Sequence, residues 1–157
     1  MQHWSTPVVA AALAAALAAC APSRHTLDPY RSDPVAADAL AARARAICAA
    51  GPEGPRTLPE EDFITDGCSL WFDDGWAEPC CVEHDIRYWC GGEAKERSAA
   101  DAVLAACVDT LEPDWFAESM RLGVRAGGHP IFPTWYRWGY GRDYSPWYDD
   151  YSAPPAP

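Results

Sequence analysis

The run from Cys80 to Tyr88 holds the side chains of this chain that are best suited to chemistry. On a helix, His84 and Tyr88 share a face because they are four residues apart, and Cys81 lies near the same side. A neutral imidazole accepts a proton from water near pH 7, and it does so best when a carboxylate fixes the ring through its other nitrogen. Asp85 is offset from His84 by about 100° and can face a neighbouring loop. The run therefore predicts a general base at His84 and a candidate cation ligand at Asp85.

The carboxylate that would fix the His84 ring is expected on the next helix. Asp101 lies shortly after the turn at Gly91-Gly92, near the start of a predicted helix over residues 95–111. An antiparallel return of the chain would bring Asp101 beside His84. Each side chain also has an ordinary interpretation, since a His-Asp pair is often a surface pair and a carboxylate near a helix start interacts favourably with the helix dipole.

Helical periodicity and end signals predict the elements that would position these side chains. The four expected helices cover residues 35–50, 78–89, 95–111 and 114–126. Asp33 and Asp114 would cap the first and the fourth helix, with Pro34 in the first turn of the first. The sequence has no convincing strand and no internal repeat. The expected fold class is therefore all-α, as one domain over residues 35–151.

Two stretches lack helical periodicity. Residues 57–79 form an acidic loop, and loops of that length are often functional. The stretch over residues 131–151 is dense in aromatic side chains: Phe132, Trp135, Tyr136, Trp138, Tyr140, Tyr144, Trp147, Tyr148 and Tyr151. We expect them to pack as an irregular lid on the helical core, with contact at a membrane interface as the alternative. Residues 152–157 are expected to be disordered.

The bulk composition narrows the class of partner. The 157 residues carry a formal net charge of −11, and nucleic-acid binding needs clustered lysine and arginine, so we expect no nucleic-acid partner. The same charge argues against electrostatic attraction to anionic lipid, but it is compatible with an apolar or cation-bridged contact. Much of the hydrophobic fraction of 49% is alanine, which buries little area, so covalent staples would help the fold.

The N-terminus has the pattern of an export signal. Residues 7–19 form an apolar stretch that is too short to span a bilayer comfortably. The sequence Leu17-Ala18-Ala19-Cys20 resembles the lipobox of bacterial lipoproteins, which implies a signal peptide over 1–19, a lipidated Cys20 and a tether over 20–34. The alternative is an ordinary secretory signal. In both cases the chain is exported to a compartment where disulfides persist.

The cysteine count agrees with lipidation. Seven cysteines are an awkward number for an exported protein, but six remain if Cys20 carries lipid. These six are Cys48, Cys68, Cys80, Cys81, Cys90 and Cys107. Spacing alone does not choose among their many pairings.

Three motifs together resemble the secreted phospholipases A2. Cys80-Cys81-x-x-His84-Asp85-x-x-Tyr88 resembles the active-site helix of that family. Asp101, followed six residues later by Cys107, is similar to the family's Asp-x5-Cys on the antiparallel helix. Thr65-Asp66-Gly67-Cys68 is similar to the Asp-x-Cys of the calcium loop in bacterial and fungal members. The motifs occur in family order and cover roughly residues 62–111.

The resemblance implies a fold and a reaction. The fold would be a small, disulfide-stapled phospholipase A2-like domain with two antiparallel core helices and a calcium loop. His84 would be the general base that activates water, Asp101 would orient it, and Tyr88 would support the pair by hydrogen bonding. The activity would be calcium-dependent hydrolysis of the sn-2 ester of phospholipids, with a phospholipid membrane surface as partner. We expect the chain to act as a monomer.

The resemblance also implies ligands and disulfides. The Asp85 and Asp66 carboxylates and the Gly67 carbonyl would hold Ca²⁺. The implied pairs are Cys68 with Cys81 and Cys80 with Cys107, which leaves Cys48 to pair with Cys90.

Two other functions fit parts of the pattern. A non-catalytic envelope lipoprotein or toxin-like binding module would keep the helices and disulfides, but it would need neither a base nor a metal ligand. A zinc site at Cys80, Cys81 and His84 is disfavoured because adjacent cysteines on a helix point about 100° apart. In the loop, Asp73 or Asp74 would either add a calcium ligand or, as we favour, belong to a solvated acidic turn.

Overall fold

The computed structural model describes residues 25–52, 54–71 and 77–143 of the chain, and within them all regular structure is helical. The elements are α2 (Pro34–Ala50), the π-helical turn η1 (Ala77–Val82), α3 (Glu83–Cys90), α4 (Ala94–Asp109) and α5 (Asp114–Gly127). The expected all-α class is confirmed. Among the described residues, none of the helices combines the length and the apolar composition that a membrane span needs.

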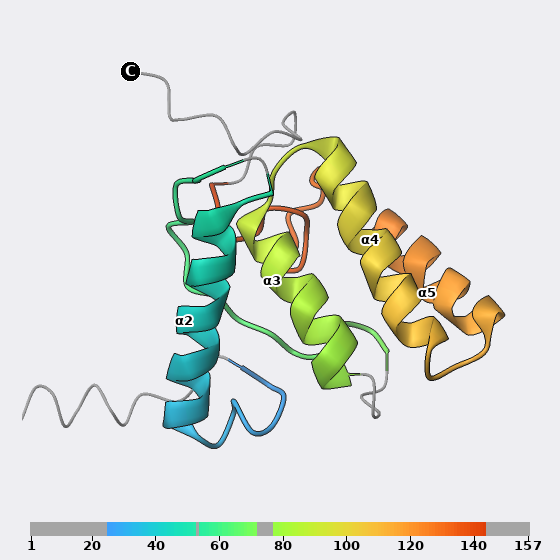
Figure 1. Cartoon of the computed structure of the whole chain (residues 1–157), viewed down its shortest axis with the longest axis horizontal. Helices are drawn as coiled ribbons and strands as arrows, with labels where there is room; N and C mark the ends of the chain where they lie inside the picture. The colour runs from blue at the N-terminus through green and yellow to red at the C-terminus, as the bar shows by residue number, and fades with distance from the viewer. Residues whose placement is uncertain (1–24, 53, 72–76, 144–157) are drawn as a thin grey trace, which may run out of the picture.

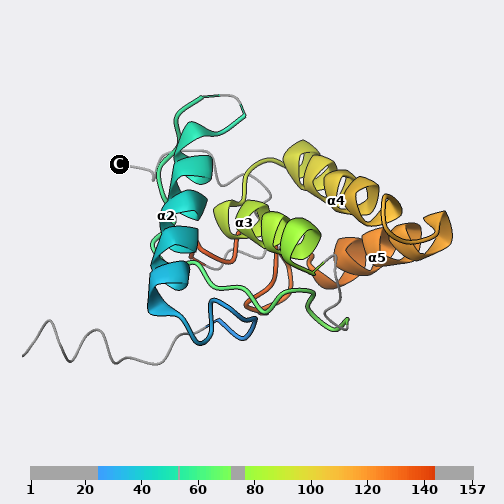
Figure 2. The ribbon, with the colours of Figure 1, turned by 60° about the horizontal axis from the view of Figure 1, so that its bottom comes forward.

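The helix α3 lies at the centre of the molecule. Figures 1 and 2 both show α3 between α2 and α4, with α5 alongside α4. The chain turns back after α3 at Gly91-Gly92, so α4 returns antiparallel to it (Figure 1). This is the return that was expected to bring Asp101 toward His84.

The ends of the helices follow local chemistry, with two exceptions. Asp33 caps α2, because its Oδ1 accepts hydrogen bonds from the N–H groups of Val35 and Ala36 at 2.9 and 3.3 Å. The cap expected at Asp114 is wrong: Pro113 occupies the N-cap of α5, and Asp114 is the first helical residue, where its charge still favours the helix dipole.

The second exception is the start of the central helix. The expected single helix over 78–89 is instead the π-helical turn η1 followed by α3. The wider turn lies where two neighbouring cysteines are tied to different elements, Cys80 to α4 and Cys81 to the preceding loop.

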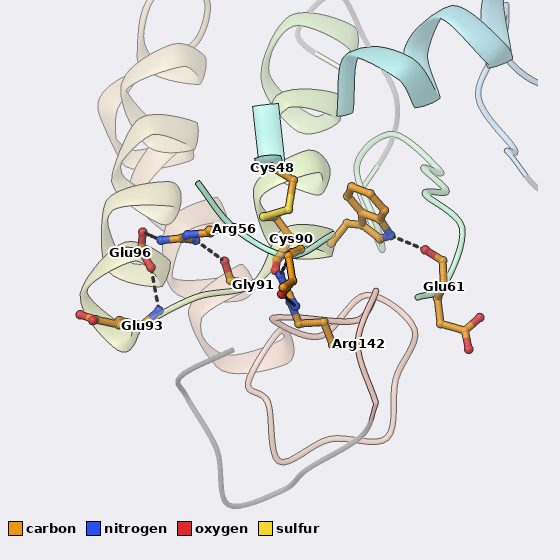
Figure 3. Close-up of a disulfide and its surroundings, with 10 residues drawn as sticks. Cys48, Arg56, Glu61, Cys90, Gly91, Glu93, Glu96 and Arg142 are labelled. Atoms are coloured by element: carbon orange, nitrogen blue, oxygen red, sulfur yellow. Dashed lines mark hydrogen bonds and ion pairs between the residues drawn. A yellow bond between two sulfur atoms is a disulfide. The ribbon is translucent and has the colours of Figure 1, made fainter. Parts of the chain in front are cut away.

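Three disulfides hold the helices together, and their pairing agrees with the implied one. Cys48–Cys90 joins α2 to the end of α3 (Figure 3), Cys68–Cys81 joins the loop to η1, and Cys80–Cys107 joins η1 to α4. Their Cα atoms are 5.5, 5.2 and 5.6 Å apart, which is ordinary disulfide geometry. The zinc site is excluded, because Cys80 and Cys81 have no free thiolates to offer.

The buried apolar side chains form two clusters. The first lies among α2, α3 and the C-terminal segment, and it includes Leu40, Ala44, Phe63, Ile86, Trp89 and Trp138. The second lies among the loop, η1, α4 and α5, and it includes Cys68, Cys81, Leu104, Val108 and Met120. In α3 itself, six of the eight residues are buried: His84, Asp85, Ile86, Tyr88, Trp89 and Cys90.

The segment after α5 donates hydrogen bonds to backbone carbonyls at the C-terminal end of α3. The last four carbonyls of a helix have no partner within it. In α3, the Arg87 carbonyl accepts from Gly91 N–H at 3.0 Å, and those of Tyr88 and Trp89 accept from the N–H groups of Gly139 and Gly141 at 2.6 and 3.2 Å. The Cys90 carbonyl accepts from Arg142 Nε at 2.7 Å, beside the Cys48–Cys90 disulfide (Figure 3). The C-terminal segment is therefore a cap for the central helix.

The aromatic side chains of this segment divide into buried and exposed groups. Trp138 is 1% exposed and donates its Nε1–H to the Gly92 carbonyl at 2.9 Å, and Tyr140 is also buried, as packing on the core requires. Phe132 and Trp135 are exposed. The later aromatic residues from Tyr144 onward lie outside the described residues, as do the predicted signal peptide, Cys20, Asp73 and Asp74.

Residues 25–33, which were expected within the tether, pack against the domain. His25 and Tyr30 are buried, and their rings lie 6.1 Å apart. His25 Nδ1 accepts the Thr65 N–H at 3.1 Å, while Thr26 N–H donates to the Thr65 carbonyl at 3.1 Å. The N-terminal segment thus fixes the backbone just before Asp66.

We expect Trp138→Ala to lower the free energy of unfolding by about 3–5 kcal/mol, because it empties a buried site and removes a cap of the α3–α4 turn. The matched control is Trp135→Ala, three residues earlier, which should cost no more than about 1 kcal/mol because that ring is 41% exposed. Denaturant unfolding of both variants measures the difference. Equal losses would show that the C-terminal segment does not support the core through Trp138.

Candidate active site

Helices α3 and α4 bring the three expected catalytic side chains together. His84 Nε2 and Asp101 Oδ1 are 3.2 Å apart, and both side chains are buried. Tyr88, one turn after His84, donates its hydroxyl to the same Asp101 oxygen at 2.7 Å. The rings of His84 and Tyr88 lie over one another with centroids 4.1 Å apart. The helical spacing and the antiparallel return therefore build one hydrogen-bonded cluster.

Two arginines, which the sequence pattern did not indicate, complete this cluster. Arg125, on α5, places its Nη1 3.0 Å from Asp101 Oδ2. Arg97, buried on α4, directs its Nε at the Tyr88 hydroxyl at 3.4 Å. Arg97 stands four residues before Asp101 on one helix, a spacing that could have suggested its place. Arg125 gives no such signal, because its position depends on how α5 packs against α4.

The surroundings of the cluster shift the pKa values of its three titratable side chains in different directions. Burial lowers the pKa of His84 below its ordinary value, and the hydrogen bond and charge of Asp101 offset this only in part. Burial alone would raise the pKa of Asp101, but hydrogen bonds from His84, Tyr88 and Arg125 outweigh it, and that pKa is lowered. Burial and the charge of Asp101 raise the pKa of Tyr88. At neutral pH the cluster holds a neutral imidazole, a carboxylate and a phenol.

These states assign the proton on the His84 ring. Asp101 is a carboxylate and can only accept, so His84 Nε2 carries the hydrogen and donates it. The lone pair is then on Nδ1. Among the described residues, Asp101 is the one hydrogen-bond partner of this ring. Nδ1 is therefore left to accept a proton from a molecule in the pocket that His84 lines.

The second group of expected site residues lies around Asp85. Its Oδ2 accepts a hydrogen bond from the Thr65 hydroxyl, and the Gly67 N–H donates to that same hydroxyl oxygen at 3.1 Å. Asp66 Oδ1 accepts from the Ser69 hydroxyl at 2.8 Å. Thr65, for which the sequence analysis proposed no role, thus connects Asp85 of α3 to the loop.

The buried side chain of Tyr140 is influenced by the charges of both carboxylates. Burial and then the negative charges of Asp85 and Asp66 raise the pKa of Tyr140 well above its ordinary value. The Tyr140 hydroxyl donates to the Ile64 carbonyl, one residue before Thr65. The Tyr140 hydroxyl therefore lies within electrostatic range of both carboxylates.

This donor set suits a hard cation. Two carboxylates beside a backbone carbonyl are oxygen ligands of the kind that Ca²⁺ prefers, and the hydroxyls of Thr65 and Ser69 would orient the carboxylates. The described residues contain no group of three or more His, Cys, Asp or Glu side chains able to hold a metal. A cation at Asp66 and Asp85 would therefore complete its shell with carbonyl oxygens, such as that of Gly67, and with water.

One pocket joins the two groups. It has a volume of about 110 Å³, and Ser69, His84 and Asp85 are among its polar lining residues, together with Gly67. Most of the remaining lining is apolar, with Trp71, Leu104, Met120, Val124 and Tyr136 among its members. Leu70 also lines the pocket and is 88% exposed, so the pocket reaches the surface there. The pocket can hold an apolar chain whose polar end meets the imidazole and the Asp85 carboxylate.

The Tyr88 hydroxyl should contribute to folding through its bond to a charged acceptor. We expect Tyr88→Phe to lower the free energy of unfolding by about 1.5–3 kcal/mol, measured by denaturant titration. Tyr136→Phe is the control, because it removes a hydroxyl in the same pocket for which no hydrogen bond is found within the described residues. A loss for Tyr88→Phe no larger than that for the control would contradict the hydrogen-bonded cluster.

Comparisons of the chain with protein-family models, with curated proteins and with solved structures found no match. The resemblance to secreted phospholipases A2 therefore depends on the three motifs themselves. What this site does is inferred from its residues and their contacts.

Proposed function

We propose that this chain is a calcium-dependent, phospholipase A2-like carboxylic ester hydrolase that cleaves the sn-2 ester of phospholipids. One observation carries the proposal: a buried neutral histidine, oriented by a carboxylate, lines the same apolar pocket as Asp85 and Gly67. The motif resemblance implies these roles for the same residues. The all-α fold with its three disulfides is compatible with a phospholipase A2-like domain.

In this proposal His84 is the general base. Its Nδ1 accepts a proton from a water molecule as that water attacks the ester carbonyl. The positive charge that develops on the ring is stabilised by the Asp101 carboxylate, to which Nε2–H donates. Tyr88 keeps Asp101 in place by its 2.7 Å hydrogen bond. Asp101 remains ionised throughout, because its other donors hold its pKa low.

Asp85, Asp66 and the Gly67 carbonyl would hold the metal in this proposal. When bound there, Ca²⁺ supplies electrostatic stabilisation for negative charge on the ester carbonyl oxygen. The protein's own contribution is to fix the two carboxylates: Thr65 donates to Asp85, and Ser69 donates to Asp66. In this proposal His84, Asp85 and Gly67, which line one pocket, would meet the same side of a substrate.

The apolar lining would select a lipid acyl chain. Each methylene that leaves water contributes about 0.8 kcal/mol, so even a few groups against Leu104, Met120 and Val124 favour a chain over a short ester. The lining has no lysine or arginine among the described residues, and the ligand is accordingly recognised by its apolar part.

A phospholipid membrane surface is the proposed partner. Leu70, at the pocket, and Trp115, at the start of α5, are among the most exposed large apolar side chains of the described residues. Because the chain is strongly acidic, contact with lipid would depend on such apolar side chains rather than on charge. We propose that Leu70 enters the lipid and brings the pocket to the surface.

We also propose that the chain is exported as a bacterial envelope lipoprotein and acts as a monomer. The three disulfides support export, because disulfides persist in oxidising compartments. The lipobox-like sequence ending at Cys20 supports the lipid anchor. An anchor would hold the domain near its substrate.

The hydrolase proposal predicts a specific loss in His84→Gln. With vesicles of zwitterionic phospholipid labelled in the sn-2 acyl chain, label release should fall by about 100- to 10,000-fold, and a calcium chelator should abolish release by the wild type. His129→Gln, at an exposed histidine, should keep wild-type activity. A wild type that binds Ca²⁺ and vesicles but releases no label would instead indicate a non-catalytic binding module.

The membrane proposal predicts weaker vesicle binding by Leu70→Asn. Leu70 has a positive φ of 66°, which asparagine tolerates better than most residues, so the fold should be retained. Co-sedimentation with vesicles should decrease, while hydrolysis of a dispersed short-chain ester should not. Leu58→Asn is the control, since Leu58 is exposed but does not line the pocket. Equal binding by both variants would exclude Leu70 as the contact.

A further inference from the structure

The Asp101 carboxylate is held on both of its oxygens. Oδ1 receives His84 Nε2 at 3.2 Å and the Tyr88 hydroxyl at 2.7 Å. Oδ2 receives Arg125 Nη1 at 3.0 Å. The terminal torsion of an aspartate is broad, so one well-held oxygen does not by itself fix the carboxylate plane. The bond from Arg125 to the second oxygen supplies the missing constraint.

Arg125 is itself held in place by the neighbouring helix. Arg97 on α4, buried in the core, donates its Nη2 to the backbone carbonyl of Arg125. The same guanidinium directs its Nε at the Tyr88 hydroxyl. The last turn of α5 is therefore fastened to the cluster at the residue whose side chain reaches Asp101.

Arg125 also compensates the charge of the buried Asp101 carboxylate. Asp101 is buried and ionised. A buried carboxylate requires a compensating partner, and Arg125 supplies a full positive charge. Its side chain is 36% exposed against 1% for Asp101, so it reaches inward from the surface.

We infer that Arg125 is a positioning residue that holds the Asp101 carboxylate in the plane from which Oδ1 meets His84. This inference rests on the proposed function. Arg125 does not line the pocket, so it has no contact with the substrate bound there. Because the Asp101 side chain is buried, loss of Arg125 should lower stability as well as catalysis, so the rate is compared in folded protein.

The test compares Arg125→Met with Arg121→Met in the full chain. Arg121 is a matched control, because it lies one turn earlier on α5 and makes a half-exposed ion pair with Glu118. With sn-2-labelled vesicles and saturating Ca²⁺, we expect kcat to fall by about 10- to 100-fold in Arg125→Met, with KM unchanged, and no change in Arg121→Met. Guanidinium ion at low concentration should restore part of the rate of Arg125→Met, because the site is open to solvent.

A second measurement does not require activity. The Nε2–H proton of His84 is held by Asp101, so its downfield NMR signal should be present in the wild type and Arg121→Met, and lost or broadened in Arg125→Met.

The outcomes separate the inference from the proposed function. An unchanged signal and rate in folded Arg125→Met would overturn the inference and leave the proposed function intact. A wild type without hydrolysis would overturn the proposed function, and the NMR comparison would still decide the positioning role. If Arg125→Met does not fold, Arg125→Lys and Arg125→Gln replace it in the same two measurements. The inference predicts that Arg125→Lys keeps the wild-type rate and signal, whereas Arg125→Gln loses both. A wild-type rate and signal in Arg125→Gln would overturn the inference.

Discussion

The buried carboxylate of Asp101 is the interaction on which the rest of the site depends. An ionised carboxylate away from water is costly unless its oxygens are hydrogen-bonded. Here the donors come from His84 and Tyr88 on α3 and from Arg125 on α5, while Asp101 itself lies on α4. Satisfying one charge thus requires three helices to meet at one point. The same contacts keep His84 oriented, so the stability of the cluster and its chemistry have a common origin.

The helix α3, which carries the proposed base, depends on the elements around it. At eight residues, α3 is too short to be stable alone. Every disulfide has one cysteine in the 80–90 segment, and the partners lie on α2, on the loop and on α4. At its C-terminal end, its last carbonyls are satisfied by the turn and by the segment after α5. Covalent links and borrowed hydrogen bonds therefore fix α3 on several sides, as a preorganised base requires.

What could be predicted from the sequence was local or motif-based. The cap at Asp33 was visible because it depends on a few neighbouring residues, and the meeting of His84 with Asp101 followed from helical spacing and an antiparallel return. The contact of Arg125 with Asp101 could not be predicted from the sequence, because it depends on how α5 packs against α4. Asp114 was misjudged as a cap because a capping residue type is only a preference, and here Pro113 takes the position.

His84 and Asp85 are neighbours in sequence but serve different parts of the site. The offset of about 100° between consecutive helical residues sends one side chain toward α4 and α5 and the other toward the loop. His84 meets Asp101, whereas Asp85 meets Thr65, whose backbone is fixed in turn by His25. A small rotation of α3 about its axis would disturb both contacts at once. The fold therefore couples the placement of the proposed base to that of Asp85, a proposed metal ligand, and the constraints on α3 act on both halves of the proposed reaction together.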